Sequence, residues 1–267
     1  MSPFRRARHA AQRSRVAVNA PTTAKWFELM WRSYFFAFPF LALYVTVGAL
    51  VFVPLTWLTR DIRPIYWVAR QGCRLGLWLS GVRMRVVNLE YAFQHPTALF
   101  VANHVSNIEP AALFSVLPRI AVILKKELSK IPLLGYVMGL GGFIYVDRKV
   151  RDSRKHAMQQ GVKTLQSGVG LMVFPEGTRS PDKQLLPFRS GPFSMAMEAG
   201  VPIVPVTVHG TERLMPKGSS VVRPGRMALV FHAPIETKNL REQDRQELMA
   251  LVRATMEATL NGPSPLA

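Results

Sequence analysis

From Val82 onward, short β-rich runs alternate with helix-like stretches in this 267-residue chain. This alternation constrains the fold strongly, because strands separated by helices form mostly parallel sheets with helices against them. We predict an α/β domain over residues 82–260, a mostly parallel sheet flanked by helices, including helices at Asp152–Gln166 and Glu242–Leu260. The expected strands are Met84–Val87, Ala98–Ala102, Ala121–Leu124, Phe143–Val146, Leu171–Phe174, Ile203–Val208 and Met227–Phe231.

A segment without charged side chains precedes this domain, from Ser33 to Thr59. It is long enough for a membrane span, but Pro39 and Pro54 leave only Phe40–Val53 uninterrupted. That stretch gives about 21 Å of helix against a hydrocarbon core of about 30 Å. We therefore expect residues 25–81 to form a membrane-associated helical pair inserted in one leaflet. A true span and an ordinary buried core helix are the two alternatives.

The second helix of the pair is expected at Pro64–Gly81, where apolar residues recur at helical spacing. Trp67 and Trp78 are suited to the depth of lipid headgroups, because their rings are amphipathic. Three arginines fall near another face of this helix: Arg63, Arg70 and Arg74. The pattern predicts an interfacial amphipathic helix.

The net charge of +18 favours anionic partners. Anionic membrane lipids explain the charge and the apolar segment together, whereas no nucleic-acid recognition module is visible. We predict that residues 1–24 form a basic, disordered arm, although an organellar transit peptide would have a similar composition. Residues 261–267 form a Pro/Ser tail that we expect to fray. Cys73 is the only cysteine and the histidines lack metal-ligand spacing, so we expect no disulfide, metal or cofactor.

The run Asn103–Glu109 places His104 five residues before Glu109. A neutral histidine can take a proton from an alcohol, and a nearby carboxylate can fix its tautomer and stabilise the imidazolium. An alternative remains open, because Ser106-x-x-Glu109 is also a capping-box pattern in which Glu109 would cap a helix and orient nothing.

Other segments add cations and hydroxyls at predicted strand ends. The loop Phe174–Ser180 offers an acid, a glycine, a hydroxyl and a guanidinium, a combination that suits phosphate. His104, Arg148 and Glu176 each follow a predicted strand, so all three should meet at one edge of the sheet. Arg189 is expected to be a surface charge. The absence of Gly-x-Ser-x-Gly and P-loop motifs disfavours serine hydrolases and nucleotide phosphotransferases.

Four blocks in order resemble the glycerophospholipid acyltransferase family, and within it the 1-acylglycerol-3-phosphate acyltransferases. The blocks are Asn103–Glu109, Gly142–Arg148, Phe174–Ser180 and Val201–Val206. The resemblance implies an enzyme that transfers a fatty acyl group from acyl-CoA or acyl-acyl carrier protein to lysophosphatidic acid, forming phosphatidic acid. It also implies membrane association, with the active site on the cytoplasmic face (the inner membrane if bacterial).

By this resemblance, His104 is the general base and Glu109 its partner. Relatives usually carry Asp where this chain has Glu109, and the extra methylene shifts the carboxylate by about 1.5 Å. A misplacement near 1 Å can cost about a hundredfold in rate. The implied phosphate-binding residues are Lys125, Arg148, Glu176, Gly177, Thr178 and Arg179. The implied acyl-chain side is lined by Val201, Pro202 and Ile203.

Two further readings stay open. The acceptor could be another lysolipid, such as a lyso-ornithine lipid, because such an enzyme would share every motif. The chain could also be a catalytically weak lipid-binding protein on the same fold, with Glu109 as the cause of the weakness. Sequence also does not separate Lys125 from Lys126 as the phosphate ligand.

Overall fold

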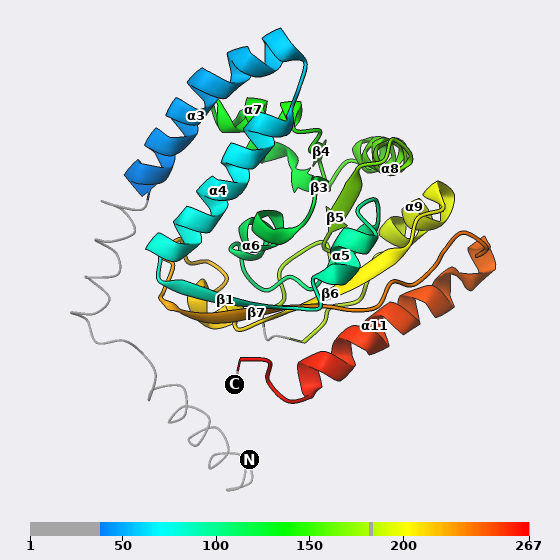
Figure 1. The fold of residues 1–267 in the computed structure, drawn as a ribbon. Coiled ribbons are helices and arrows are strands. Elements are labelled where there is room, and N and C mark those ends of the chain that lie inside the picture. The colour runs from blue at the N-terminus through cyan, green and yellow to red at the C-terminus, as the bar shows by residue number, and fades with distance from the viewer. Residues whose placement is uncertain (1–37, 182–183, 267) are drawn as a thin grey trace, which may run out of the picture.

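The computed structural model describes residues 38–181 and 184–266, and in this part of the chain seven strands form one sheet. The strand order is β1-β7-β6-β2-β5-β3-β4 (Figure 1). The strands are β1 (Val82–Val87), β2 (Leu99–Ala102), β3 (Ile120–Lys125), β4 (Ile144–Val146), β5 (Gly170–Val173), β6 (Ile203–His209) and β7 (Gly225–Phe231). All neighbouring strands are parallel except β6 and β7, so the predicted mostly parallel sheet is confirmed.

Helices cover both faces of the sheet. One face packs against α4 (Arg63–Leu79), α5 (Glu90–Gln94) and α6 (Glu109–Val116). The other packs against α8 (Arg151–Gln166), α9 (Gly191–Ala199) and α11 (Arg245–Asn261). The residues of β2 alternate between the two cores, and all are fully buried. A strand buried on both faces reads as a continuous apolar run, which is why these short segments could be recognised in the sequence.

The carboxyl ends of β6, β2, β5, β3 and β4 lie along one edge of the sheet. β2 pairs with both β5 and β6, and Leu99 is in register with Leu171 on one side and Ile203 on the other. The loops that follow these three strands are therefore neighbours, although they are far apart in the sequence.

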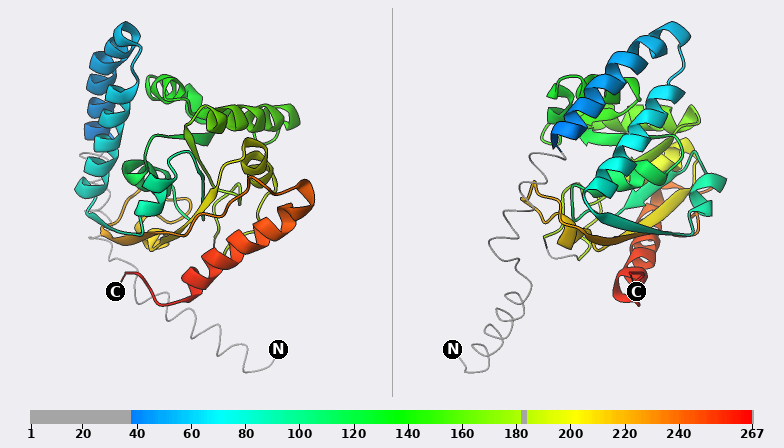
Figure 2. Two further views of the ribbon diagram at one scale, coloured as in Figure 1. Left: turned by 45° about the vertical axis from the view of Figure 1, so that its right-hand side comes forward. Right: turned by 60° about the vertical axis from the view of Figure 1, so that its left-hand side comes forward.

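The apolar segment forms α3 (Phe38–Thr59), a helix that continues through Pro54. At 1.5 Å per residue its length is about 33 Å. The interruption expected at Pro54 does not occur, because the helix runs on to Thr59. Pro39–Thr59 is long and apolar enough to cross a membrane, and only 17% of its most apolar window is buried. That exposure excludes the buried core helix. The predicted helical pair is present, with α3 and α4 side by side along one margin of the molecule (Figure 2).

Two arginines of α4 contact the neighbouring helix α6. Arg74 Nε donates to the carbonyl of Ser115 at 3.0 Å, and Arg70 contacts the carbonyl of Val116 at 3.4 Å. These carbonyls are at the C-terminal end of α6, where backbone acceptors lack helical partners and the helix dipole is negative. Arg70 and Arg74 therefore connect α4 to the end of α6, although Arg74 remains exposed. Trp67 is exposed, as expected.

The remaining elements are short: η2 (Lys126–Lys130), α7 (Leu134–Leu140), α10 (Thr211–Leu214) and η3 (Glu242–Asp244). The predicted closing helix begins as η3 and continues as α11. The tail returns to the sheet, where Arg85 Nη1 donates to the carbonyl of Pro265 at 3.0 Å. The predicted N-terminal arm, residues 1–24, lies outside the described residues.

Candidate active site

His104 follows β2 and is held by the loop that follows β5. Its backbone N–H donates to Glu176 Oε1 at 2.9 Å, and its carbonyl accepts from the N–H of Ser180 at 2.7 Å. The Phe174 ring stacks on the imidazole, with ring centroids 4.1 Å apart. Because β2 and β5 are adjacent, this loop fixes His104 from both sides of its backbone and from one face of its ring.

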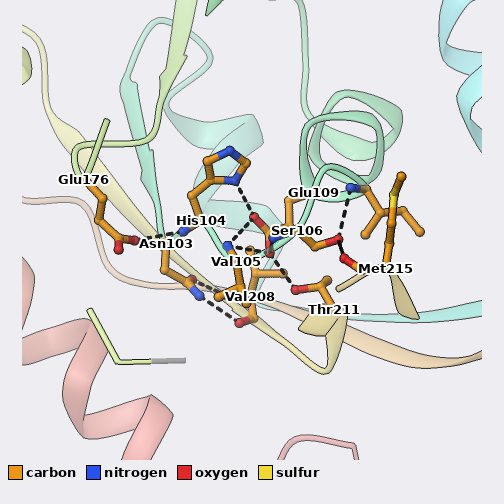
Figure 3. A network of polar contacts seen from close by, with 10 residues as sticks. Asn103, His104, Val105, Ser106, Glu109, Glu176, Val208, Thr211 and Met215 are labelled. Atoms are coloured by element: carbon orange, nitrogen blue, oxygen red, sulfur yellow. Dashed lines mark hydrogen bonds and ion pairs between the residues drawn. The ribbon is translucent and has the colours of Figure 1, made fainter. Parts of the chain in front are cut away.

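Glu109 lies against the imidazole (Figure 3). Glu109 Oε2 is 2.8 Å from His104 Nδ1, with the carboxylate side chain fully buried and the histidine side chain 13% exposed. We assign the proton to Nδ1, because a carboxylate can only accept it there. The other ring nitrogen, Nε2, is then an acceptor for a proton. The pair has the geometry of an oriented general base.

The Glu109 carboxylate also accepts hydrogen bonds from the backbone N–H groups of Val105 and Ser106 and from the Thr211 hydroxyl, which is 2.6 Å away. A fully buried carboxylate needs such donors. The contact with Ser106 is half of the capping box that the sequence suggested as an alternative. Glu109 therefore fixes the start of α6 and contacts His104 at the same time.

Thr211 was not predicted, since it lies 102 residues from Glu109 in the sequence. Thr211 follows β6, and the carboxyl ends of β6 and β2 lie side by side. This shared edge of the sheet was the one feature of the sequence pattern from which the contact could have been predicted. Asn103 makes a comparable long-range contact. Its side-chain amide donates to the carbonyl of Val208 at 3.0 Å and accepts from the N–H of Val208 at 2.7 Å, which ties the His104 loop to β6.

Glu176 was predicted among the phosphate-binding residues, but the structure places it behind His104. Its Oε2 accepts from the N–H of Leu186 at 2.9 Å while Oε1 holds the N–H of His104. Burial raises the pKa of the Glu176 carboxyl, although the two backbone donors act in the opposite direction. Each oxygen accepts one backbone N–H, so Glu176 ties the loop that carries His104 to the segment that carries Leu186.

Two guanidinium groups converge on Gly177. Arg148 Nη1 donates to the Gly177 carbonyl at 2.6 Å. A Cβ at Gly177 would lie 2.4 Å from Arg189 Nε, and the φ of Gly177 is +70°, which favours glycine. Burial and the neighbouring Arg189 charge lower the pKa of Arg148. Arg189 is exposed, as expected for a surface charge, and its backbone N–H donates to the carbonyl of Pro175, which places it beside the same loop.

Arg179 lies in the same loop, and part of its guanidinium group is buried. Its Nη1 is buried and has no hydrogen-bond partner among residues 38–181 and 184–266. Burying part of a guanidinium without an acceptor is costly, so this group suits an anionic ligand. Thr178, beside it, is exposed. Lys125 is exposed at the end of β3 and pairs with Glu127 at 2.9 Å.

The segment predicted to line the acyl chain lies elsewhere. Ile203 begins β6 in register with Leu99, and Ala102, the last residue of β2, is about 10 Å further along the strands at about 3.3 Å per residue. Val201 and Ile203 are buried in the core formed with α9 and α11. Because β6 runs parallel to β2, the start of β6 is at the opposite edge of the sheet from His104. Val201, Pro202 and Ile203 are thus not brought to the site.

The described residues contain no group of three or more His, Cys, Asp or Glu side chains arranged to hold a metal ion. Cys73, on α4, is a free thiol. Burial raises its pKa to about 11.

Comparisons with known proteins agree with this geometry. The profile of the family described as Acyltransferase matches residues 83–209. A 1-acyl-sn-glycerol-3-phosphate acyltransferase of Chlamydomonas reinhardtii is 37% identical over 54% of this chain and 44% of its own length. One of Saccharomyces cerevisiae is 35% identical over 70% of this chain and 63% of its own length. The chain thus spans less than two thirds of these two curated relatives.

A solved structure is similar over almost its whole length. The crystal structure of the 1-acyl-sn-glycerophosphate acyltransferase from Thermotoga maritima superposes with a TM-score of 0.68 at 27% identity, covering 84% of this chain and 97% of that one. The similarity of the two folds therefore extends over most of this chain. Residues 83–209 therefore form an acyltransferase domain that is similar in sequence and fold to 1-acyl-sn-glycerol-3-phosphate acyltransferases.

Proposed function

We propose that this protein transfers a fatty acyl group from an acyl thioester to the free hydroxyl of 1-acylglycerol-3-phosphate, forming phosphatidic acid at a membrane surface. The observation that carries the proposal is the His104–Glu109 pair, whose buried contact of 2.8 Å leaves Nε2 as the proton acceptor. The names of the relatives in Chlamydomonas and yeast support the choice of acceptor.

His104 Nε2 would take the proton of the acceptor hydroxyl as the hydroxyl oxygen attacks the thioester carbonyl. Glu109 would stabilise the imidazolium that forms. Collapse of the tetrahedral intermediate breaks the C–S bond, and the departing thiolate takes the proton back from His104. A positioned general base of this kind contributes about 10²–10⁴-fold in rate.

The phosphate of the acceptor would bind at the loop after β5. Arg179 supports this through its buried Nη1, which has no hydrogen-bond partner in the part of the chain that the structure describes, and Arg148 through its position on the Gly177 carbonyl. Guanidinium groups bind phosphate through two parallel hydrogen bonds, so they also orient it. Lys125 and Thr178 would complete the set from the exposed rim, and Gly177 leaves the room that Arg189 occupies.

The acyl donor would be acyl-CoA or acyl-acyl carrier protein. Both are anionic, so the net charge of +18 would favour their approach as well as attachment to anionic lipids. We place the site on the cytoplasmic face, where both donors are found (the inner membrane if bacterial). The apolar, exposed α3 supports membrane attachment.

The proposal is tested by an acyl-transfer assay on the purified full chain in lipid vesicles. Lysophosphatidic acid, lysophosphatidylcholine, lysophosphatidylglycerol and a lyso-ornithine lipid would each be offered with acyl-CoA and with acyl-acyl carrier protein. We expect phosphatidic acid as the main product, with kcat/KM for lysophosphatidic acid at least about tenfold above that of the others, because only this acceptor has a terminal phosphate for the arginines. Preference for another lysolipid would contradict the acceptor, and no product with any pair would contradict catalysis.

A further inference from the structure

A second apolar and basic surface lies outside the candidate site, in the segment that follows β3. Every residue from Lys125 to Pro132 is exposed. Among them, Leu128 and Ile131 are 36% and 39% exposed, and Tyr136 in α7 is 48% exposed. Lys125 pairs with Glu127, so Lys126 and Lys130 give the segment a net positive charge. Exposed apolar side chains between lysines are typical of surfaces that lie in a membrane interface.

This segment is continuous with the exposed face of α3. Trp57 Nε1, near the end of α3, donates to the Tyr136 hydroxyl at 3.1 Å, and the two rings meet edge to face. Apolar residues of α3, α4 and α7, together with Leu133 just before α7, pack in one small core: Ala49, Val53, Ile65, Leu133, Val137 and Leu140. All views show α7 beside α3 (Figures 1 and 2). Trp and Tyr are enriched where membrane and water meet, which fits a shared depth.

The segment is also held in a fixed shape. A Cβ at Gly135 would lie 2.4 Å from the carbonyl oxygen of Ser129, so the backbones of η2 and α7 are in direct contact. Tyr145 in β4 donates to the carbonyl of Gly135 at 2.7 Å, which ties α7 to the sheet. Leu133, between η2 and α7, has a φ of +62°, a region that favours glycine. Leu128 and Ile131 are therefore presented by a packed turn.

We propose that η2 and α7 form a third membrane contact beside α3 and α4. Leu128, Ile131 and Tyr136 would enter the boundary between headgroups and acyl chains of an anionic bilayer, and Lys126 and Lys130 would bind lipid phosphates. The inference rests on the membrane attachment of α3 proposed above. Because η2 directly follows Lys125 at the carboxyl end of β3, this contact sets the height of the candidate site above the bilayer.

The test uses single cysteines in the full chain. In a Cys73→Ala background, Ile131→Cys and the control Leu251→Cys would be labelled with a polarity-sensitive fluorophore. Leu251 is 51% exposed on α11, on the side of the molecule away from α3 (Figure 1). The proteins would be reconstituted in equimolar phosphatidylcholine–phosphatidylglycerol vesicles, with and without nitroxide-labelled lipids. We expect a blue shift and lipid quenching at position 131, and neither at position 251.

The lysines are tested in the same vesicles. The Lys126→Gln/Lys130→Gln variant should reduce quenching at position 131, whereas the matched pair Lys155→Gln/Lys163→Gln on α8 should leave it unchanged. A label at position 131 that is not quenched, in protein that floats with the vesicles, would overturn the third contact and leave the attachment of α3 intact. A blue shift without lipid quenching would indicate a protein partner and would also overturn it.

Flotation of the unlabelled protein separates this inference from the proposed function. Failure to float would contradict the attachment of α3, and with it the third contact. Intact quenching at position 131 together with no acyl transfer would instead support the membrane contact and count against the proposed reaction.

Discussion

Glu109 shows how one longer side chain can serve two purposes at the site. Its carboxylate reaches His104 Nδ1 at 2.8 Å and the Thr211 hydroxyl at 2.6 Å, and it also holds the backbone N–H groups at the start of α6. The local backbone is thus arranged around a glutamate. The extra methylene of glutamate, which we expected to displace the carboxylate, leaves the 2.8 Å contact with His104 intact.

The first prediction concerns Glu109→Asp. The shorter side chain withdraws the carboxylate by about 1.5 Å, which would break the contacts with His104 and Thr211 together. We expect kcat for acyl transfer to fall by about ten- to a hundredfold, with little change in KM, measured by steady-state kinetics in vesicles. Glu236→Asp, outside the site, is the matched control. An Asp variant more active than the wild type would show that Glu109 weakens the natural site.

Arg179 gives a second prediction. In Arg179→Lys, an ammonium replaces the planar guanidinium whose Nη1 is buried without a partner, so the two-pronged contact with phosphate is lost. We expect KM for lysophosphatidic acid to rise by about tenfold. Arg213→Lys, which changes an exposed arginine paired with Glu212, should leave KM unaltered. Equal kinetics for the Arg179 and Arg213 variants would remove Arg179 from the phosphate site.

The residues that sequence reasoning found and missed differ in how far their contacts reach. His104, Arg148 and Arg179 could be located because each follows a recognisable apolar strand. The clamp between Asn103 and Val208 and the contact between Thr211 and Glu109 join positions more than 100 residues apart, so no local pattern encodes them. Arg189 is a surface residue as predicted, but its close approach to Gly177 could not be predicted, since it depends on the absence of a side chain there.

At the scale of elements, the antiparallel pair β6–β7 carries two half-buried histidines. His232, just after β7, is hydrogen-bonded through Nε2 to the hydroxyl of Thr207 in β6 at 2.8 Å. Burial lowers the pKa of both His209 and His232. The neighbouring His209 lowers the pKa of His232 further, whereas Glu212 acts in the opposite direction on the pKa of His209. Both therefore prefer to be neutral in the folded protein.

The third prediction follows from these shifts. As pH falls below 6.5, the unfolded chain binds protons at both histidines before the folded chain does, so the free energy of unfolding decreases. We expect the His209→Gln/His232→Gln variant to lose less stability than the wild type between about pH 7.5 and about pH 5.5, measured by denaturant unfolding. Glu176, with a raised pKa, acts in the opposite direction, but it is common to both proteins. Parallel pH profiles would contradict the assignment.

Which elements could be predicted depended on whether burial left a local pattern. The strands are short, apolar and buried, and all seven were recognised. The interruption predicted at Pro54 was wrong. Proline removes a backbone donor and crowds the preceding turn, yet α3 continues through it. Arg70 and Arg74 could be assigned to one helix face from their spacing, but their contacts with backbone carbonyls of α6 depend on packing that the spacing does not encode.

At the scale of the whole molecule, α3, α4 and the η2–α7 segment gather on one side, and α11 lies on the other (Figure 2). The apolar surface is concentrated on α3, while the candidate site lies at the carboxyl edge of the sheet. The sequence predicted a membrane helix pair and an α/β domain separately. Their relative placement could not be predicted, because it depends on packing between α3, α4 and α7 that no single segment encodes.

The most direct measurement is the initial rate of phosphatidic acid formation by wild type and His104→Ala in the same vesicles, with the amount of bound protein matched by flotation. Removing the base should lower the rate by at least about a hundredfold. Because His104 is far from α3 in sequence and contacts no membrane helix in the interactions described, flotation should be unchanged. A His104→Ala protein that floats normally and turns over at the wild-type rate would contradict the account.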